Sequence, residues 1–414
     1  MDLLYESELD VTAPYAIETV QAIGQNVGLK RKEQYRALRC LLANLYIHRG
    51  RSIGVPRSRN TMLPARYNPL RVGAASLVTA LDGLATNGFV DQKIGSASVD
   101  PALRSLTTVT ATKRLLTVFQ DNDWAIDACS RRRPEIIRLK DADHKLTDYV
   151  DSPFTVAARE YLQDYCSLLD RTALCLDSPS QYKDFDQPRL RRTFLNNSFW
   201  QGGRIYGPWC QESSTERAYI RIEQKPTVEI DYPASHVNVL YLLETGARLP
   251  EGEDPYEIVL NGLSVDRATV KKSVSIALNS YSSRGFANSV AKNVGSGLRP
   301  STILSAFLDK HPAIAHHYLR GPEHGNLIQF YESEILMNVI RYFTTRSIPI
   351  LTIYDSVCIS EEHHDALRRV MFGAECDEQF LSVYRGIGST DFQREVECPL
   401  SPRSAEPLVQ SVNS

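Results

Sequence analysis

The second half of the chain contains short segments in which apolar residues alternate with polar ones, and these segments restrict the possible folds more than any other feature. The segments 218–223 (AYIRIE) and 226–233 (PTVEIDYP) predict two neighbouring strands with a Lys-Pro turn between them. The segment 347–362 (SIPILTIYDSVCISEE) predicts two further strands, which meet around Asp355. Two of these segments contain an isolated aspartate, Asp231 in 226–233 and Asp355 in 347–362, and a helical pattern follows each of the two.

Helical periodicity dominates the rest of the chain. Residues 14–48 predict two helices, and residues 110–201 are expected to be mostly helical. Basic clusters at 131–133 and 189–192 interrupt this second region. Such clusters either follow a phosphate backbone or form a solvated surface, and the sequence leaves both interpretations open.

A chain of 414 residues is long enough for two or three domains. We expect an α+β fold with a helical region at 1–120, a second helical region at 121–200 and a mixed domain of strands and helices at 201–400. The closing residues 401–414 have the composition of a disordered tail.

The segment from residue 74 combines a helix with a short strand. The helical period of Ala74–Thr86 ends at Asn87-Gly88, a common stop signal, and an apolar strand with a Gly-bearing turn follows. Helix, tight turn, strand and basic turn residue resemble a winged-helix module with Ala74–Thr86 as the recognition helix. The alternative is a small helical subdomain that does not contact DNA.

The composition is that of an ordinary soluble protein, with 43% hydrophobic and 23% charged residues. The net charge is only −2, so a nucleic-acid partner would require a locally basic groove. The 8 cysteines include no CxxC pair, which favours incidental thiols in a reducing compartment. The N-terminus lacks the pattern of a signal sequence, and no apolar stretch reaches the roughly 18 residues of a membrane helix. We expect a cytoplasmic protein.

A basic helix is predicted between the two aspartates, over residues 266–286. It carries Arg267, Lys271 and Lys272 near its start, and Arg267 and Lys271 share one face. Cations on a helix can neutralise a polyphosphate, and two carboxylates can bridge divalent ions about 3.5 to 4 Å apart. This combination is what nucleotidyl transfer needs. The adjacent histidines 316–317 and 363–364 are expected to point to different sides of a helix and to be poor metal ligands.

Five motifs follow one another in the second half: GGRIY, EIDYPASHVNVLY around Asp231, the basic helix, NLIQFYESEILMNVI from Asn326, and ILTIYDSV around Asp355. Their order resembles the palm and fingers of family A DNA polymerases and of phage-type single-subunit RNA polymerases. The resemblance implies a palm and reduced fingers at 201–400 and a thumb-like region at 121–200. The winged-helix-like region at 1–120 would bind nucleic acid. Two Mg²⁺ ions, or Mn²⁺, are implied as cofactors.

The resemblance also implies roles for individual residues. Asp231 and Asp355 would hold the metal ions, and Arg267 and Lys271 would bind the triphosphate, with Lys271 donating a proton to pyrophosphate. Contacts to the primer, template or product strand are implied for Arg204 and Gln329. Lys272 projects about 100° away from Lys271 on a helix, so it is either a template contact or a solvated charge.

The chain departs from both families at several positions. Asn279-Ser280 replaces the Tyr-Gly of the basic helix, with Tyr281 beyond it, so Asn279 and Tyr281 are the candidates for contacts to the sugar and base. His236 stands where DNA polymerases have a Glu that excludes the ribose hydroxyl; it either acts on the sugar or pairs with a carboxylate. Tyr354 replaces the usual His before the second aspartate. The short distances between motifs leave no room for an exonuclease or promoter-binding domain.

The sequence thus predicts a template-directed DNA or RNA polymerase that uses nucleoside triphosphates, as in the replication or priming proteins of phages and mobile elements. The alternative is a non-catalytic DNA-binding replication initiator or regulator with a degenerate polymerase-like domain. The missing Tyr-Gly pair is the feature that favours this alternative.

Overall fold

The computed structural model of the chain describes residues 3–373, apart from 59–62, 97–104, 133, 186–187, 251, 261 and 295–297. The tail predicted at 401–414 and the end of the domain predicted at 201–400 lie outside the described residues. The chain divides into two compact units, the first ending at Glu135 and the second beginning at Ile136. The first boundary therefore lies later than residue 120, because the end of this unit pairs with its beginning: β2 (Leu9–Val11) and β6 (Cys129–Arg131) are antiparallel neighbours.

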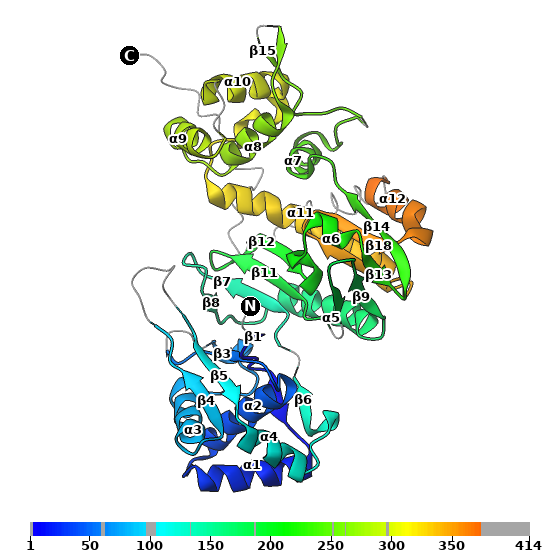
Figure 1. The fold of residues 1–414 in the computed structure, drawn as a ribbon. Helices are drawn as coiled ribbons and strands as arrows, with labels where there is room; N and C mark the ends of the chain where they lie inside the picture. Colours follow the sequence, from blue (N-terminus) through cyan, green and yellow to red (C-terminus); the bar gives the residue numbers. More distant parts are fainter. Residues whose placement is uncertain are drawn as a thin grey trace. The chain divides into compact units, whose positions relative to one another are not determined.

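The first unit packs helices against a small sheet (Figure 1). Its helices are α1 (Pro14–Asn26), α2 (Lys32–Ile47), α3 (Ala74–Thr86) and α4 (Lys113–Asp121), with short 3-10 turns η2 (Ala65–Tyr67) and η4 (Ile126–Ala128). Its main sheet has the order β1 (Leu3–Leu4), β3 (Ile53–Val55), β5 (Thr107–Ala111) and β4 (Val90–Lys93). β1 is parallel to β3, and the other neighbours are antiparallel. The helices predicted within 14–48 and at Ala74–Thr86 are confirmed.

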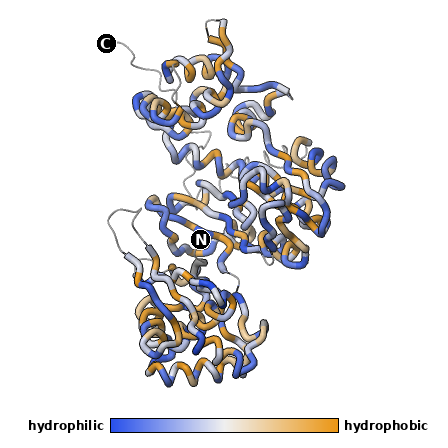
Figure 2. The backbone as a smooth tube through the Cα atoms, viewed as in Figure 1, coloured by the Kyte–Doolittle hydropathy of each residue, from blue (hydrophilic) through white to orange (hydrophobic). Residues whose placement is uncertain are grey.

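Helix α2 lies at the centre of the core of this unit. Its residues Leu38, Leu41 and Leu42 are fully buried, and α3 contributes Leu81 and Leu84. Leucines three or four positions apart share one helix face, which is why the helical pattern was readable from the sequence. Figure 2 shows apolar and polar residues alternating along these helices.

The second unit contains a six-stranded sheet in which all neighbours are antiparallel. Its order is β10 (Tyr182–Asp184), β9 (Leu174–Asp177), β13 (Ile220–Ile222), β14 (Lys225–Asp231), β18 (Ser356–Ser360) and β17 (Ile350–Ile353). A four-stranded sheet has the order β12 (Ser198–Tyr206), β11 (Arg191–Leu195), β7 (Ile137–Lys140) and β8 (Leu146–Thr147). A small hairpin joins β15 (Val259–Leu260) and β16 (Leu263–Ser264).

The strands predicted around the two aspartates are present. The segment 347–362 forms the β17–β18 hairpin, and the segments on either side of the predicted turn form β13 and β14. The turn itself consists of Glu223 and Gln224, with φ of 51° and 65°, whereas Lys225 and Pro226 already belong to β14. Positive φ at both turn residues suits the twist of a two-residue hairpin, and this conformation decides the position of the turn.

The helices of the second unit surround these sheets. They are α5 (Pro153–Leu169), α6 (Ser214–Arg217), α7 (Ser235–Thr245), α8 (Arg267–Leu278), α9 (Ser283–Asn293), α10 (Pro300–Lys310), α11 (Pro322–Thr344) and α12 (His364–Phe372), with 3-10 turns η5 (Pro208–Gln211), η6 (Pro312–His317) and η7 (Glu361–His363). Helices α8, α9 and α10 pack on one another. Figure 1 shows this helical group near one end of the long helix α11.

Helix α11 packs closely against β12. Gly203 of β12 lies close to this helix: it has a φ of 77°, and a Cβ there would lie 2.7 Å from Ser333 Oγ. Only glycine accommodates both the left-handed backbone and the contact. The GGRIY motif is therefore fixed against α11, and its next residue, Arg204, faces the same helix.

The expectation of a mostly helical region at 121–200 is wrong. Within the described part of that region, α5 is the only long helix, and most other residues with regular structure belong to β6 to β12. The basic cluster at 189–192 illustrates the difference. Arg192 lies in β11, is 1% exposed and pairs with Glu334 of α11. Arg192 therefore belongs to the core and cannot follow a phosphate backbone. This buried pairing depends on a distant residue, so local periodicity gave no sign of it.

The basic helix predicted over 266–286 is interrupted. α8 ends at Leu278, and α9 begins at Ser283. Three polar side chains bond to the backbone in this interval: Asn279 to the Ser275 carbonyl, Ser280 to the Ile276 carbonyl, and Ser282 to the N–H of Gly285. Such local bonds compete with helical ones, so the polar run stops one helix and caps the next.

Candidate functional site

Asp231 and Asp355 come together at one end of the β14–β18 pair. β14 ends at Asp231, which is in register with Ser356 of β18. Asp355 lies in the turn between β17 and β18, and its carbonyl accepts a hydrogen bond of 3.2 Å from the N–H of Tyr232. The antiparallel sheet thus joins two aspartates that are far apart in the sequence.

The turn that presents Asp355 is strained. Tyr354 precedes it with a φ of 56°, a left-handed conformation that costs a non-glycine residue about 1 kcal/mol or more. Contacts around the Tyr354 ring offset this cost: the Tyr206 ring lies 6.0 Å away edge-on, and the Arg204 guanidinium lies 5.8 Å from the ring centroid. The backbone at Asp355 is therefore held by its surroundings.

The environment of the two aspartates disfavours their ionised forms. Partial burial, followed by the Asp355 carboxylate, raises the pKa of Asp231 to about 6, although Lys271 acts in the opposite direction. Burial and the Glu332 carboxylate raise the pKa of Asp355, while Arg204 opposes them. A divalent cation would relieve the repulsion between these carboxylates, and oxygen donors suit Mg²⁺.

Glu332 is an essential part of this arrangement that sequence reasoning missed. It is 2% exposed, and its Oε2 accepts bonds from Nε and Nη2 of Arg204 at 3.0 and 2.6 Å. Its Oε1 accepts a bond of 2.6 Å from the Ser235 hydroxyl. Burial by itself would raise the pKa of Glu332, but His236 and Arg204 keep this pKa below its usual value.

A signal for Glu332 was present in the sequence. It has Ile328 four residues before it and Ile335 three residues after it, and both are buried on the same face of α11. A lone acidic residue on an apolar helix face must have a partner when it is buried. The partner, Arg204, could not be identified without the fold.

His236 lies at the start of α7, and its Nε2 is 3.6 Å from Glu332 Oε1. Its ring and the side chains of Lys271 and Asp355 line a pocket of about 160 Å³, together with Tyr256. The structure thus places His236 beside the Glu332 carboxylate. A carboxylate partner was one of the two roles expected for this residue. It also places His236 in the same pocket as the candidate metal ligand Asp355.

Helix α8 places its cations at two adjoining pockets. The Asp266 side chain caps the helix by accepting a bond of 2.8 Å from the N–H of Thr269. Lys271 lines the pocket with Asp355 and interacts electrostatically with Asp231. The predicted neighbourhood of this lysine and the two aspartates is therefore present.

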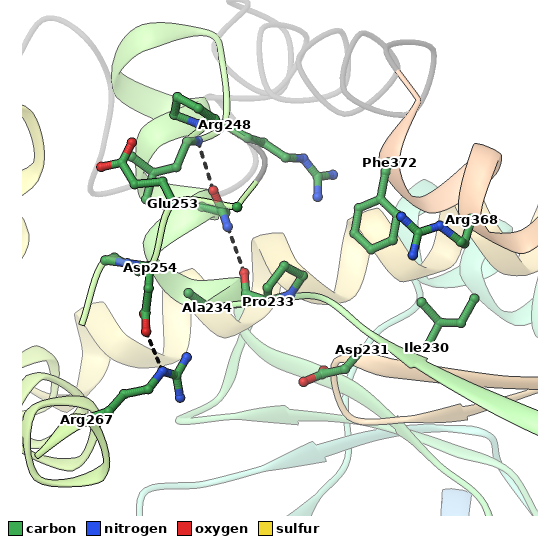
Figure 3. Close-up of a pocket in the computed structure, with 15 residues that line it drawn as sticks. Ile230, Asp231, Pro233, Ala234, Arg248, Glu253, Asp254, Arg267, Arg368 and Phe372 are labelled. Carbon is green, nitrogen blue, oxygen red and sulfur yellow. Dashed lines mark hydrogen bonds and ion pairs between the residues drawn. The ribbon is translucent and has the colours of Figure 1, made fainter. Parts of the chain in front are cut away.

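Arg267 lines a second and larger pocket, of about 630 Å³, together with Asp231 (Figure 3). Its Nε lies 2.5 Å from Asp254 Oδ2, and its guanidinium carbon lies 5.4 Å from the centroid of the Tyr256 ring. Side chains of Arg248 and Arg368 also line this pocket. These two arginines belong to none of the five motifs, so no sequence pattern pointed to them.

Three other predicted residues, Tyr281, Lys272 and Asn279, make contacts within the protein. Tyr281 donates a hydrogen bond to Glu323, and the Lys272 ammonium donates to the carbonyl of Asn293. Asn279 packs against Gly325 of α11, where an added Cβ would lie 2.1 Å from the Asn279 Oδ1 atom. Gln329 is half-buried on α11, three residues before Glu332. Their contacts with a nucleotide or with a primer-template duplex stay predictions.

No known protein family model matches the chain, and neither a curated protein nor a solved structure resembles it significantly. Among the helices that the structure describes, none is long and apolar enough to cross a membrane.

Proposed function

We propose that this protein is a template-directed nucleotidyltransferase that extends a DNA or RNA strand from nucleoside triphosphates. The observation that carries the proposal is the meeting of Asp231 and Asp355 at one end of a sheet, opposite Lys271 of a separate helix. Carboxylates on one wall and a cation on the other match the distribution of charge in phosphoryl transfer.

Asp231 and Asp355 would hold two Mg²⁺ ions. When bound, such ions lower the pKa of an attacking hydroxyl group and neutralise charge on the leaving pyrophosphate. The raised pKa of Asp231 supports this assignment, because a partly buried carboxylate that also repels its neighbour gains most from a nearby divalent cation.

The cations of α8 would bind the triphosphate. Arg267 and Lys271 are four residues apart, so both face the pockets beside Asp231. The pairing of Arg267 with Asp254 is exposed, and a triphosphate can replace this carboxylate as the partner of Arg267. Lys271 would donate a proton to the leaving pyrophosphate. Arg248 and Arg368, on the wall of the larger pocket, add positive charge for the same substrate.

The buried pair of Arg204 and Glu332 would position the metal-binding residues. Arg204 lies within electrostatic range of Asp355 and contacts the Tyr354 ring, so it supports the turn that presents the aspartate. About a fifth of the Arg204 side chain is exposed, which leaves it able to contact the growing strand. His236 would meet the sugar of the incoming nucleotide from the same pocket as Lys271.

The first unit would bind nucleic acid as a winged helix. In support, α3 is followed by the antiparallel strands β4 and β5, the order of a recognition helix and wing. The segment of the wing at 97–104 lies outside the described residues. Helix α3 carries no lysine or arginine, so its contribution to phosphate binding would be smaller than that of a basic recognition helix.

Primer extension tests the catalytic proposal. Wild type and Asp355→Asn are given primed DNA or RNA templates with Mg²⁺ and either dNTPs or rNTPs. We expect extension by wild type with one nucleotide class and none by the variant. Extension by Asp355→Asn at the wild-type rate would refute the assignment. A wild-type protein that binds DNA but extends no primer and binds no Mg²⁺-nucleotide would favour the non-catalytic initiator.

A further inference from the structure

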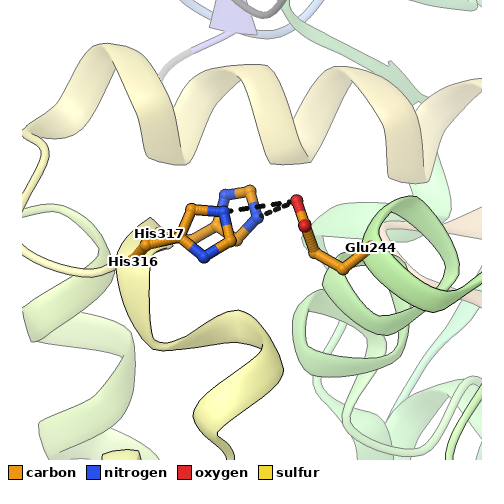
Figure 4. A group of neighbouring side chains, drawn as sticks. All are labelled: Glu244, His316 and His317. Carbon is orange, nitrogen blue, oxygen red and sulfur yellow. Dashed lines mark hydrogen bonds and ion pairs between the residues drawn. The ribbon is translucent and has the colours of Figure 1, made fainter. Parts of the chain in front are cut away.

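A second group of potential metal ligands lies away from the aspartates, where η6 meets α7 (Figure 4). Glu244 is near the end of α7, and His316 and His317 end η6. The Nε2 atoms of His316 and His317 lie 3.3 and 2.7 Å from the same oxygen of Glu244, Oε1. The three ligand atoms lie within 4.8 Å of one another.

The adjacent histidines do not point to different sides of a helix, so the geometric reason for expecting poor metal ligands is wrong for this pair. The centroids of their rings are only 4.2 Å apart. The reason is local: η6 is a short 3-10 turn that ends at His317, and the chain becomes extended at Tyr318, so regular helical spacing does not apply.

One of these histidines has a partner on its other ring nitrogen. His317 Nδ1 lies 3.0 Å from Nε2 of His324, a buried residue in the first turn of α11. A bond on the far nitrogen fixes the orientation of a ring, as it does for most histidines that bind metals. The His317 ring is only 3% exposed, whereas His316 and Glu244 are 54% and 33% exposed. The group therefore has a fixed, buried ligand and an open side.

We propose that Glu244, His316 and His317 bind a divalent transition metal, with Zn²⁺ as the best match. Two imidazoles and one carboxylate suit Zn²⁺, whose sites with three protein ligands leave the fourth position to water. The access of solvent to His316 and Glu244 provides that position. Mg²⁺ prefers oxygen donors and would bind weakly to such a group, which separates this site from the aspartates.

A metal ion at this site would link two helices that contribute to the candidate active site. α7 begins with Ser235 and His236 and ends beside Glu244, and η6 leads directly into α11, which carries Glu332. The ion would fix the C-terminal part of α7 to the segment preceding α11. Its role is thus to position structure, and the proposal does not depend on the chemistry proposed above.

Zn²⁺ titration of the full chain, purified without a polyhistidine tag and in the presence of millimolar Mg²⁺, tests the site. We expect wild type to bind one equivalent of Zn²⁺, to gain thermal stability with it and to give a visible absorption band with Co²⁺. Glu244→Gln and His316→Ala change exposed side chains, so they are expected to fold. Each should weaken Zn²⁺ binding at least about tenfold, and His324→Asn should weaken it about 10- to 100-fold.

The chain contains a matched control. His363 and His364 are also adjacent, but each lies beside a different carboxylate, of Glu362 and Asp365. The double variant His363→Ala/His364→Ala should bind Zn²⁺ like wild type. The proposal is overturned if wild type binds no Zn²⁺, or if Glu244→Gln binds it as tightly as wild type. The three side chains would then form only hydrogen bonds, in which the ring N–H groups donate to Glu244.

Discussion

Two walls of the candidate site differ in how they are built. The carboxylate cluster, Asp231, Asp355 and Glu332, depends on strand pairing and on the buried Arg204–Glu332 pair. The cationic face of α8, Arg267 and Lys271, is exposed and follows from local helix spacing. Preorganised charges act on the transition state, whereas exposed, solvent-screened charges act mainly on substrate binding. Lys271 is the expected exception on the exposed wall, because it lines the same pocket as Asp355. Changes to the two walls should therefore have different effects on kcat, KM and stability.

The largest effect is expected at Asp355. Asp355→Asn keeps the size of the side chain but removes a proposed metal ligand, and we expect kcat to fall at least about 10³-fold. The repulsion from Glu332 disappears, so the metal-free variant should be no less stable than wild type. Single-turnover extension and thermal unfolding measure the two quantities. Asp365→Asn, at an exposed position on α12, is the control, and an equal loss there would contradict the assignment.

Glu332→Gln tests the buried part of the carboxylate cluster. It leaves the Arg204 charge without its partner, and such a loss costs about 3 to 5 kcal/mol of folding free energy. Urea unfolding measures this change. Glu362→Gln removes an exposed, solvent-screened partner of Lys225 and should change the unfolding free energy little. Similar losses of unfolding free energy in the two variants would show that the buried Arg204–Glu332 pair stabilises the fold no more than the surface pair does.

Lys271→Ala tests the cationic face at the point nearest the aspartates. Loss of a general acid lowers kcat about 10²- to 10⁴-fold, and we expect the lower end because Arg267 remains. Folding should be little affected, since the side chain is exposed. Lys292→Ala on α9 is the control. If Lys271→Ala raised KM alone, the lysine would bind substrate without acting in the chemical step.

The pH dependence follows from the raised pKa of Asp231. At pH values between the usual pKa of an aspartate and about 6, Asp231 keeps its proton in the folded protein but releases it in the unfolded chain. The stability of the metal-free protein therefore falls as pH rises through this range. The stability advantage of Asp231→Asn should therefore grow from about pH 4 to pH 6 and level off above it. Mg²⁺ must displace the same proton, so its affinity should fall about tenfold per pH unit below about pH 6.

Thermal unfolding of both proteins across this range, with Mg²⁺ titrations of wild type, tests these two expectations. A Mg²⁺ affinity that did not change between pH 5 and pH 7 would contradict the involvement of Asp231.

The smallest effect is expected at Arg267. Its bond to Asp254 is exposed, so Arg267→Ala should change stability by less than about 1 kcal/mol. Loss of one phosphate contact should raise the KM for nucleotide about tenfold and leave kcat nearly unchanged. Steady-state kinetics measures both. A large fall in kcat would place Arg267 with the residues that act on the transition state and would remove the contrast between the two walls.

Local patterns in the sequence determined several elements of this protein. Alternating apolar residues specified β14, β17 and β18, and helical spacing specified α3, α7 and the start of α8. The positions of Asp231 and Asp355 at strand ends followed from the same patterns. Such features are readable because strand and helix periods and capping residues act over only a few neighbouring residues.

Only the tertiary structure decided which residues surround the aspartates. Arg204 and Glu332 meet because β12 packs on α11 at Gly203, and the paired histidines of η6 meet Glu244 because α7 lies beside that turn. Arg192, which looked like part of a basic surface, became a core residue through a bond to α11. These partners are distant in the sequence, and the desolvation of a buried charge depends on three-dimensional packing that no local pattern encodes.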